Sequence, residues 1–385
     1  MKPLDIGVFG ARGIPSTYSG YETFLTSLLP ELVQRGHSVT MYCRTGEVDG
    51  SGPYLGVDRV VLPALPGKQF NTLSHGLLAS ARARVARHDV VLAVNVANAL
   101  FCALHRYTGV PVVLNTDGQE WLRGKWGNAA KAYFKTSAKW AGRCATALVS
   151  DCEAMQNVYR DEFNATSTVI PYSVPSKPIA PSPEVLARLG IERNGYFIVA
   201  ARLNPENNVD AIAQRYTQTS FDMPLVVLGA ANYQSPVEQN LANAAARDSR
   251  IRVVGHVDNR DEFFELLGSA RAYLHGHSVG GINPSLVEAM HAGARIAALD
   301  TPFNRETLGQ QCTLFTLDSL GDVLADVLAE SEQVQESVRS YASSRARTRF
   351  NVDAVVSAYE ELLSVAAASS SRTPLALRTQ WNADA

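Results

Sequence analysis

The sequence contains no run of 18 or more apolar residues, and so no segment that would cross a bilayer as a helix. Its first residues lead directly into a strand-like stretch and lack the apolar core and cleavage site of a signal peptide. The five cysteines include no C-x-x-C pair, and no histidine set has zinc-finger spacing. These absences favour a reduced, cytoplasmic chain, with attachment to the inner face of the plasma membrane left open.

Two catalytic signatures are also missing. No G-x-G-x-x-G occurs after the first predicted strand, which argues against a Rossmann oxidoreductase. No D-x-D occurs anywhere, so the sequence offers no site for a catalytic divalent metal, and we expect neither a metal nor a cofactor. Charged residues are only 19% of the chain and the net charge is −2, which argues against a nucleic-acid partner. The charge is uneven, however: residues 1–173 are net basic and the remainder is net acidic.

What is present is a regular alternation of short apolar runs and helix-period segments. A chain of 385 residues with 46% hydrophobic residues is long enough for two cores. The alternation predicts βα units and parallel sheets, with the clearest helix at 21–35. The strand candidates lie at 6–9, 38–42, 60–62, 90–94, 112–114, 147–149 and 168–170, and again at 196–200, 225–228, 251–254, 272–275, 296–299 and 314–315.

Five prolines within residues 171–183 interrupt this pattern and predict a linker between two Rossmann-like domains. We expect an N-terminal domain over 1–173, a C-terminal domain over 174–350, a helix over 351–367 and a flexible tail over 368–385. In open α/β sheets, ligands bind outside the carboxyl ends of the strands. The loops that follow the strands are therefore where a site is expected.

The glycine-rich loop at 10–22 directly follows the first strand, and its candidate ligand contacts are Arg12, Gly13, Ser19 and Gly20. Glycines let a backbone approach a phosphate closely. Asp117 follows the fifth strand in an Asp-Gly pair and is placed to face a ligand. An ordinary turn remains the alternative interpretation for both loops.

The second half offers a candidate anion site. Arg202 follows the first strand of this half, and its planar fork suits a diphosphate. After the strand at 272–275, Gly280 and Gly281 turn the chain before Asn283 caps a helix whose free amides favour an anion. Glu288, one turn further on, suits the hydroxyls of a ribose. We expect His275 and His277 to line a cleft as polar residues and not to bind a metal.

A basic helix face is the last candidate surface. Lys131, Lys135, Lys139 and Arg143 recur every four residues and so share one side of a helix. Trp126, Tyr133, Phe134 and Trp140 lie among them. Basic residues with aromatics suit a membrane headgroup layer, although a solvated helix face is the default interpretation.

At these residues the chain resembles glycosyltransferase family 4, which has the GT-B fold. The resemblance covers most of the chain and rests on Arg-Gly-His-Ser-Val at 35–39, on Arg202, and on Glu-Ala-Met-His-Ala-Gly at 288–293. It implies two Rossmann-like domains with a cleft between them and a last helix that returns to the first domain. Arg202, Asn207, Gly280, Gly281, Asn283 and Glu288 would then hold the donor, and Asp117, Arg202 and Glu288 would be the catalytic set.

The chain departs from that family where its usual glutamate is Gly280, its usual lysine is Asn207 and its first paired glycine is Ser19. With the Ala-Arg-Gly-Ile-Pro stretch at 11–15 and the Asp-Gly-Gln-Glu-Trp stretch at 117–121, these features resemble a rhamnosyltransferase branch.

That resemblance implies a retaining, metal-independent transfer of a hexosyl group, L-rhamnose from dTDP-L-rhamnose, to a polyprenyl-diphosphate-linked glycan in cell-surface polysaccharide synthesis. A UDP- or GDP-sugar donor, a sugar-nucleotide epimerase of the same fold and a non-catalytic binding protein are the alternatives.

Overall fold

The computed structural model describes residues 2–15, 20–50, 52–67, 70–173, 179–230 and 235–369. The chain divides into two compact units. The first comprises residues 1–122, 126–173 and 352–385, and the second comprises residues 123–125 and 174–351. Part of the predicted linker, at 174–178, and the tail from residue 370 lie outside the described residues, as does Ser19.

The first unit is built on a seven-stranded parallel sheet in the order β3-β2-β1-β4-β5-β6-β7. Its central strands are entirely buried because apolar residues occupy both faces, as expected for a parallel sheet covered on both sides. The strands are β1 (Asp5–Phe9), β2 (Ser38–Arg44), β3 (Asp58–Leu62), β4 (Val90–Val94), β5 (Val112–Asn115), β6 (Ala147–Ser150) and β7 (Thr168–Val169).

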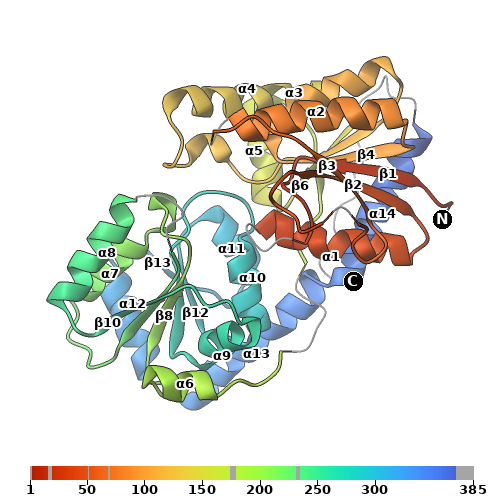
Figure 1. Cartoon of the computed structure of the whole chain (residues 1–385). Coiled ribbons are helices and arrows are strands. Elements are labelled where there is room, and N and C mark those ends of the chain that lie inside the picture. Colours follow the sequence, from red (N-terminus) through yellow and green to blue (C-terminus); the bar gives the residue numbers. More distant parts are fainter. Residues whose placement is uncertain are drawn as a thin grey trace. The chain divides into compact units, whose positions relative to one another are not determined.

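Helices cover both faces of this sheet (Figure 1). One face carries α1 (Gly20–Gln34) and the last helix, α14 (Val352–Ala368), which pack against each other. The other carries α2 (Phe70–Ala86), α3 (Ala99–Cys102) and α4 (Asn128–Cys144). The remaining elements are α5 (Glu153–Phe163) and the 3₁₀ turns η1 (Val96–Asn98), η2 (Ala103–Tyr107) and η3 (Glu120–Leu122).

The second unit repeats the architecture with a six-stranded parallel sheet in the order β10-β9-β8-β11-β12-β13. The strands are β8 (Phe197–Ala200), β9 (Leu225–Leu228), β10 (Ile251–Gly255), β11 (Ala272–His275), β12 (Ile296–Leu299) and β13 (Thr313–Phe315). Phe197, Val227 and Leu274 from three of these strands share one buried core with Ile212 and Leu324 from the covering helices.

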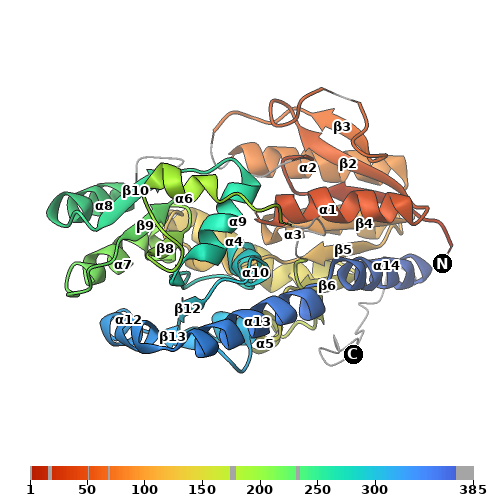
Figure 2. The ribbon, with the colours of Figure 1, turned by 90° about the horizontal axis from the view of Figure 1, so that it is seen from below.

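The helices of the second unit also form two layers (Figures 1 and 2). One layer contains α7 (Val209–Tyr216), α8 (Pro236–Arg247) and α12 (Leu320–Ala329). The other contains α6 (Glu184–Leu189), α9 (Arg260–Ser269), α10 (Pro284–His291) and α13 (Glu332–Arg349). The 3₁₀ turn η4 (Pro205–Asn207) and helix α11 (Pro302–Leu308) complete the unit. The predicted pair of Rossmann-like parallel-sheet domains is thus confirmed, with every predicted strand present.

Candidate functional site

The loop between β11 and α10 ends in a capped helix start. The Asn283 side chain accepts hydrogen bonds from the backbone N–H of Ser285 at 3.1 Å and from its hydroxyl at 2.8 Å, and Pro284 is the first helical residue. Gly280 has a φ of +117°, in the region that favours glycine. The first turn of α10 holds no acidic residue, so the partial positive charge of the helix start is not neutralised there.

Arg202 lies in the loop after β8, half-buried, and its guanidinium has no hydrogen-bond or ion-pair partner among the described residues. The Asn207 side chain, 2% exposed, donates to the Arg202 carbonyl at 2.7 Å. Asn207 therefore supports the loop that carries Arg202. Asn208 donates to the Gly276 carbonyl at 2.8 Å, which joins the loops after β8 and β11.

The two histidines at the end of β11 differ from each other in exposure. We expected both to line a cleft, but His275 is fully buried and its Nδ1 lies 2.9 Å from the Tyr273 hydroxyl. Its ring stacks on that of His277 at 4.3 Å. Burial lowers the pKa of His275 to about 3. Burial, His275 and nearby Arg202 all lower the pKa of His277, so both rings are neutral near pH 7.

Glu288 lies on α10, and its side chain is 15% exposed. Arg260, the first residue of α9, donates from Nη2 to Glu288 Oε1 at 2.6 Å. Burial raises the pKa of the Glu288 carboxyl, and the Arg260 charge opposes that effect. Within the second unit, Arg202, the glycine turn and His277 thus lie on the loops after β8 and β11, which the Asn208 hydrogen bond joins. The structure also shows that Glu288 is paired with Arg260.

In the first unit, the glycine-rich loop follows β1. Gly13 has a φ of +152°, and a Cβ there would lie 2.4 Å from Val48 Cγ1, so the turn requires glycine. The Arg12 guanidinium is already paired: its Nη1 lies 3.2 Å from Glu47 Oε2 and its Nε 3.9 Å from the buried Glu22. Gly20 is the first residue of α1.

Asp117 follows β5 with a φ of +55°, in the left-handed region that is costly for a residue with a Cβ. Its N–H donates to Asn115 Oδ1 at 2.9 Å, and its Oδ1 accepts from the Tyr172 hydroxyl at 3.1 Å. The side-chain Nδ2 of Asn115 donates to the Tyr359 hydroxyl of α14 at 2.7 Å. Sequence reasoning missed Tyr172, Asn115, Tyr359 and Arg260, because none stands in a recognisable motif.

The predicted basic face lies on α4. Lys135, Lys139 and Arg143 are exposed, and Trp140 is 40% exposed with Arg143 stacked on it at 4.9 Å. Two other aromatics of this face pack within the first unit, since Phe134 is buried and the Tyr133 hydroxyl donates to the Ala97 carbonyl.

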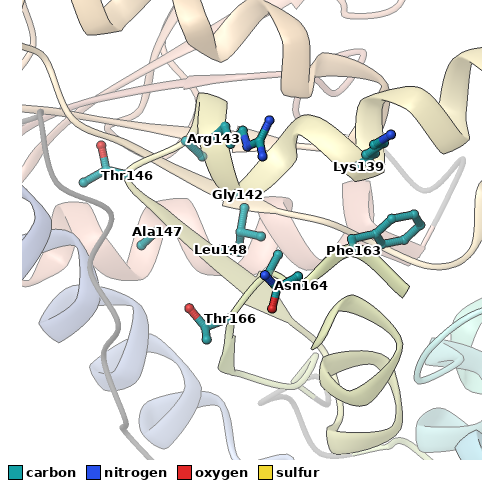
Figure 3. Close-up of a pocket in the computed structure, with 11 residues that line it drawn as sticks. Lys139, Gly142, Arg143, Thr146, Ala147, Leu148, Phe163, Asn164 and Thr166 are labelled. Atoms are coloured by element: carbon teal, nitrogen blue, oxygen red, sulfur yellow. The ribbon is translucent and has the colours of Figure 1, made fainter. Parts of the chain in front are cut away.

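A cavity of about 260 Å³ adjoins this face, beneath the end of α4 (Figure 3). Lys139 and Arg143 line it from the helix, and Asn164 and Thr166 line it from the segment between α5 and β7.

No group of three or more His, Cys, Asp or Glu side chains in the described part of the chain is arranged to hold a metal ion. None of the helices in that part combines the length and apolar character needed to span a membrane.

Comparisons with known proteins match part of the first unit to a described family. Residues 19–172 match the family described as glycosyl transferase 4-like domain. A segment of 129 residues is 23% identical to O-antigen chain mannosyltransferase B of Escherichia coli, and it covers 32% of this chain and only about a third, 34%, of that protein's length.

Solved structures share the fold across both units. Anabaena HepE matches with a TM-score of 0.75 and 16% identity over 94% of this chain and 100% of that one. Sucrose-phosphate synthase of Thermosynechococcus elongatus matches with a TM-score of 0.78 and 15% identity over 95% of this chain and 100% of that one. Residues 19–172 are thus similar to a glycosyl transferase 4-like domain, and the two Rossmann-like units together have the GT-B fold.

Proposed function

We propose that this protein is a retaining glycosyltransferase that moves L-rhamnose from dTDP-L-rhamnose to a polyprenyl-diphosphate-linked sugar. The observation that carries the proposal is the Arg202 guanidinium, which has no partner in the described part of the chain and shares its unit with the glycine turn and helix start of α10. A planar cation and a helix start are two devices that proteins use to hold a diphosphate.

The transition state explains why such groups would accelerate transfer. As the glycosidic bond breaks, negative charge builds on the departing nucleoside diphosphate. Arg202 and the start of α10 would stabilise that charge more in the transition state than in the bound donor, which is the requirement for catalysis. These protein groups would fill the role that a divalent cation has in other transferases, so no metal is needed in this proposal.

The two units would divide the substrates. In this proposal residues 174–350 hold the donor, with the nucleoside at Glu288, and residues 1–173 hold the acceptor near Gly13 and Asp117. Asp117 would orient the attacking hydroxyl or accept its proton. Retention of anomeric configuration would follow from attack on the same face that the diphosphate leaves, without a covalent intermediate.

For the donor, a solved structure supports a second candidate. Anabaena HepE, whose fold this chain shares, is described in complex with UDP and with UDP-glucose. A UDP-sugar is therefore the second candidate donor. The dTDP-rhamnose proposal rests on the motif resemblance at 11–15 and 117–121.

A donor panel tests the proposal. The protein is incubated with dTDP-, UDP- and GDP-sugars, each with and without a polyprenyl-diphosphate sugar, and the products are identified by mass spectrometry. The proposal predicts consumption of dTDP-rhamnose and release of dTDP only when the acceptor is present. An altered nucleotide sugar formed without acceptor would indicate an epimerase, and binding without turnover of any donor would indicate a non-catalytic protein.

We also propose that the α4 face holds the protein at the inner surface of the membrane where a polyprenyl acceptor resides. Its support is the exposed row of Lys135, Lys139 and Arg143 beside the exposed Trp140. Each basic side chain near an anionic surface contributes about 1 kcal/mol. This association is peripheral and would weaken as salt concentration rises.

A further inference from the structure

The carboxylate expected to hold the nucleoside sugar is already bound to an arginine. Arg260 Nη2 lies 2.6 Å from Glu288 Oε1, a distance typical of a strong charge-assisted hydrogen bond. The two residues come from α9 and α10, neighbouring helices on the same face of the second sheet. One oxygen of the Glu288 carboxylate therefore has a partner before any ligand arrives.

Packing holds the arginine in that position. Its guanidinium lies 4.9 Å from the ring centre of Phe263 and 4.7 Å from that of Phe264, and cation–π contacts of this kind favour one placement. Phe264 is buried and meets the ring of His291 on α10 edge-on at 6.2 Å. The guanidinium is thus preorganised, although the Arg260 side chain is 47% exposed.

The backbone below Arg260 is fixed as well. The Asn259 side chain accepts from the N–H groups of Asp261 at 3.0 Å and Glu262 at 3.4 Å, which caps the start of α9. The cap fixes the backbone of the first turn, and so it fixes the position of the Cα and Cβ atoms of Arg260. The geometry of the pair therefore depends on rigid elements and not on a mobile loop.

The pairing changes how many sugar hydroxyls the carboxylate can take. A free carboxylate has two oxygens and can accept both hydroxyls of a ribose at once. The Arg260 guanidinium engages Oε1 and makes that oxygen a weaker acceptor for a second donor, so Oε2 is the better acceptor for a ligand hydroxyl. A 2′-deoxyribose presents one hydroxyl there, the 3′-OH, whereas a ribose also presents a 2′-OH that would lack an equally good partner.

We propose that Arg260 makes the donor site selective for 2′-deoxyribonucleoside diphosphates over ribonucleoside diphosphates by occupying one oxygen of Glu288. This inference rests on the proposed donor site and extends it by naming the residue that distinguishes the two sugars. Binding a ribonucleotide would leave its 2′-hydroxyl unpaired in a half-buried site or would displace Arg260, and either event weakens binding about tenfold.

The sugar and the base can be tested separately. Dissociation constants are measured by isothermal titration calorimetry for UDP, dUDP, dTDP and ribothymidine 5′-diphosphate. UDP and dUDP differ only in the 2′-hydroxyl, as do ribothymidine diphosphate and dTDP. For the unmodified protein we expect each deoxyribonucleotide to bind about tenfold more tightly than its ribose counterpart.

Variants assign the effect to the arginine. Arg260→Gln should bring the ribose-to-deoxyribose ratio of dissociation constants to about one or below, because both Glu288 oxygens become available. Arg260→Lys keeps a cationic donor and should keep most of the preference. The matched control is Arg188→Gln, which removes an exposed arginine that pairs with Glu262 of α9 at 2.5 Å. Its ratio should equal that of the unmodified protein.

The outcomes separate this inference from the proposed function. If all four nucleotides bind but the Arg260→Gln variant has the same ratio as the unmodified protein, the inference is wrong and the donor site stands. If the unmodified protein binds none of the four, the donor site itself is refuted and the inference falls with it. The melting temperature of each variant confirms that the ratios come from folded protein.

Discussion

His37 and Glu360 form a hydrogen bond of 3.1 Å between Nε2 and Oε1, although 323 positions separate them in the chain. The Leu4 N–H donates to His37 Nδ1 at 3.1 Å, so Nδ1 is the acceptor nitrogen of the ring. The other ring nitrogen, Nε2, is then protonated and donates its hydrogen bond to Glu360. Arg35 Nη1 reaches the other Glu360 oxygen at 2.9 Å. One carboxylate on α14 thereby holds the last helix against the N-terminal part of the first unit.

Replacing that carboxylate should loosen the last helix. Burial opposes ionisation of Glu360, but hydrogen bonds from Arg35 and His37 outweigh it and lower the pKa of its carboxyl. We expect Glu360→Gln to destabilise the first unit by about 1.5–3 kcal/mol at pH 7, the range for hydrogen bonds to a charged group. Urea unfolding followed by circular dichroism measures the loss.

The same substitution should change the pH dependence of stability. Because the folded-state pKa of Glu360 is depressed, its contribution is complete above about pH 4.3, the value for an unfolded glutamate, and disappears as pH falls through the folded-state pKa. The stability difference between the two proteins should therefore be constant above about pH 5 and shrink below about pH 4. The neighbouring, exposed Glu361→Gln is the control. A difference that grows on acidification would refute this account of the contact.

Arg202 should be the most sensitive residue of the proposed donor site. We expect Arg202→Ala to reduce the transfer rate by about 10²–10³-fold, equivalent to about 2.7–4 kcal/mol of transition-state stabilisation. The control is Arg215→Ala, which removes an arginine paired with Asp318 on the surface of the same unit. Steady-state kinetics with saturating acceptor measures both. Full activity of the Arg202 variant would contradict the proposed leaving-group role.

Tyr172 should act through Asp117. Burial raises the pKa of the Tyr172 phenol well above its usual value, so the hydroxyl stays protonated and donates to Asp117 at any working pH. We expect Tyr172→Phe to lower kcat about tenfold by letting the carboxylate turn, while the affinity for nucleotide, which we assign to the second unit in the proposed function, stays the same.

A second buried tyrosine of the same unit provides the control. The Tyr42 hydroxyl oxygen lies 3.0 Å from His88 Nε2. Tyr42→Phe should reduce the stability by a similar amount without changing kcat. Equal kcat values for all three proteins would show that Tyr172 serves only the fold.

Charge reversal on α4 tests the membrane proposal. We expect the double variant Lys135→Glu and Lys139→Glu to lose about 2 kcal/mol or more of affinity for vesicles that contain phosphatidylglycerol, at about 1 kcal/mol per basic residue removed. Sedimentation of the protein with vesicles measures the bound fraction, and pure phosphatidylcholine vesicles give the background. The pair Arg82→Glu and Arg84→Glu on α2 is the control for net charge. Equal sedimentation of both variants would exclude a specific role for the α4 face.

The fold could be predicted because its signals are local. Each strand of both sheets contains a short, mainly apolar stretch next to polar or glycine-containing segments, and βα alternation has few topological solutions. The loop before α10 was predictable for the same reason, since Gly280, Gly281, Asn283 and Pro284 lie within one short stretch of the sequence.

The partners of the site residues could not be predicted in this way. Tyr172 is 55 positions from Asp117, and Arg260 is 28 positions from Glu288. Each pair forms because packing of separate elements brings the side chains together. Nothing in the local pattern around Arg260 distinguishes it from the other exposed arginines of the second unit. The same reasoning explains His275, whose polar character indicated a lining residue but whose place at the end of a central strand buries it.

The most direct test of the central claim is a crystal structure of the protein with dTDP bound. The account predicts density for the diphosphate between the Arg202 guanidinium and the amides at Gly280 and Gly281, with the 3′-hydroxyl of the deoxyribose at Glu288. Ordered dTDP elsewhere on the protein, with Arg202 and the start of α10 not in contact with it, would contradict the account.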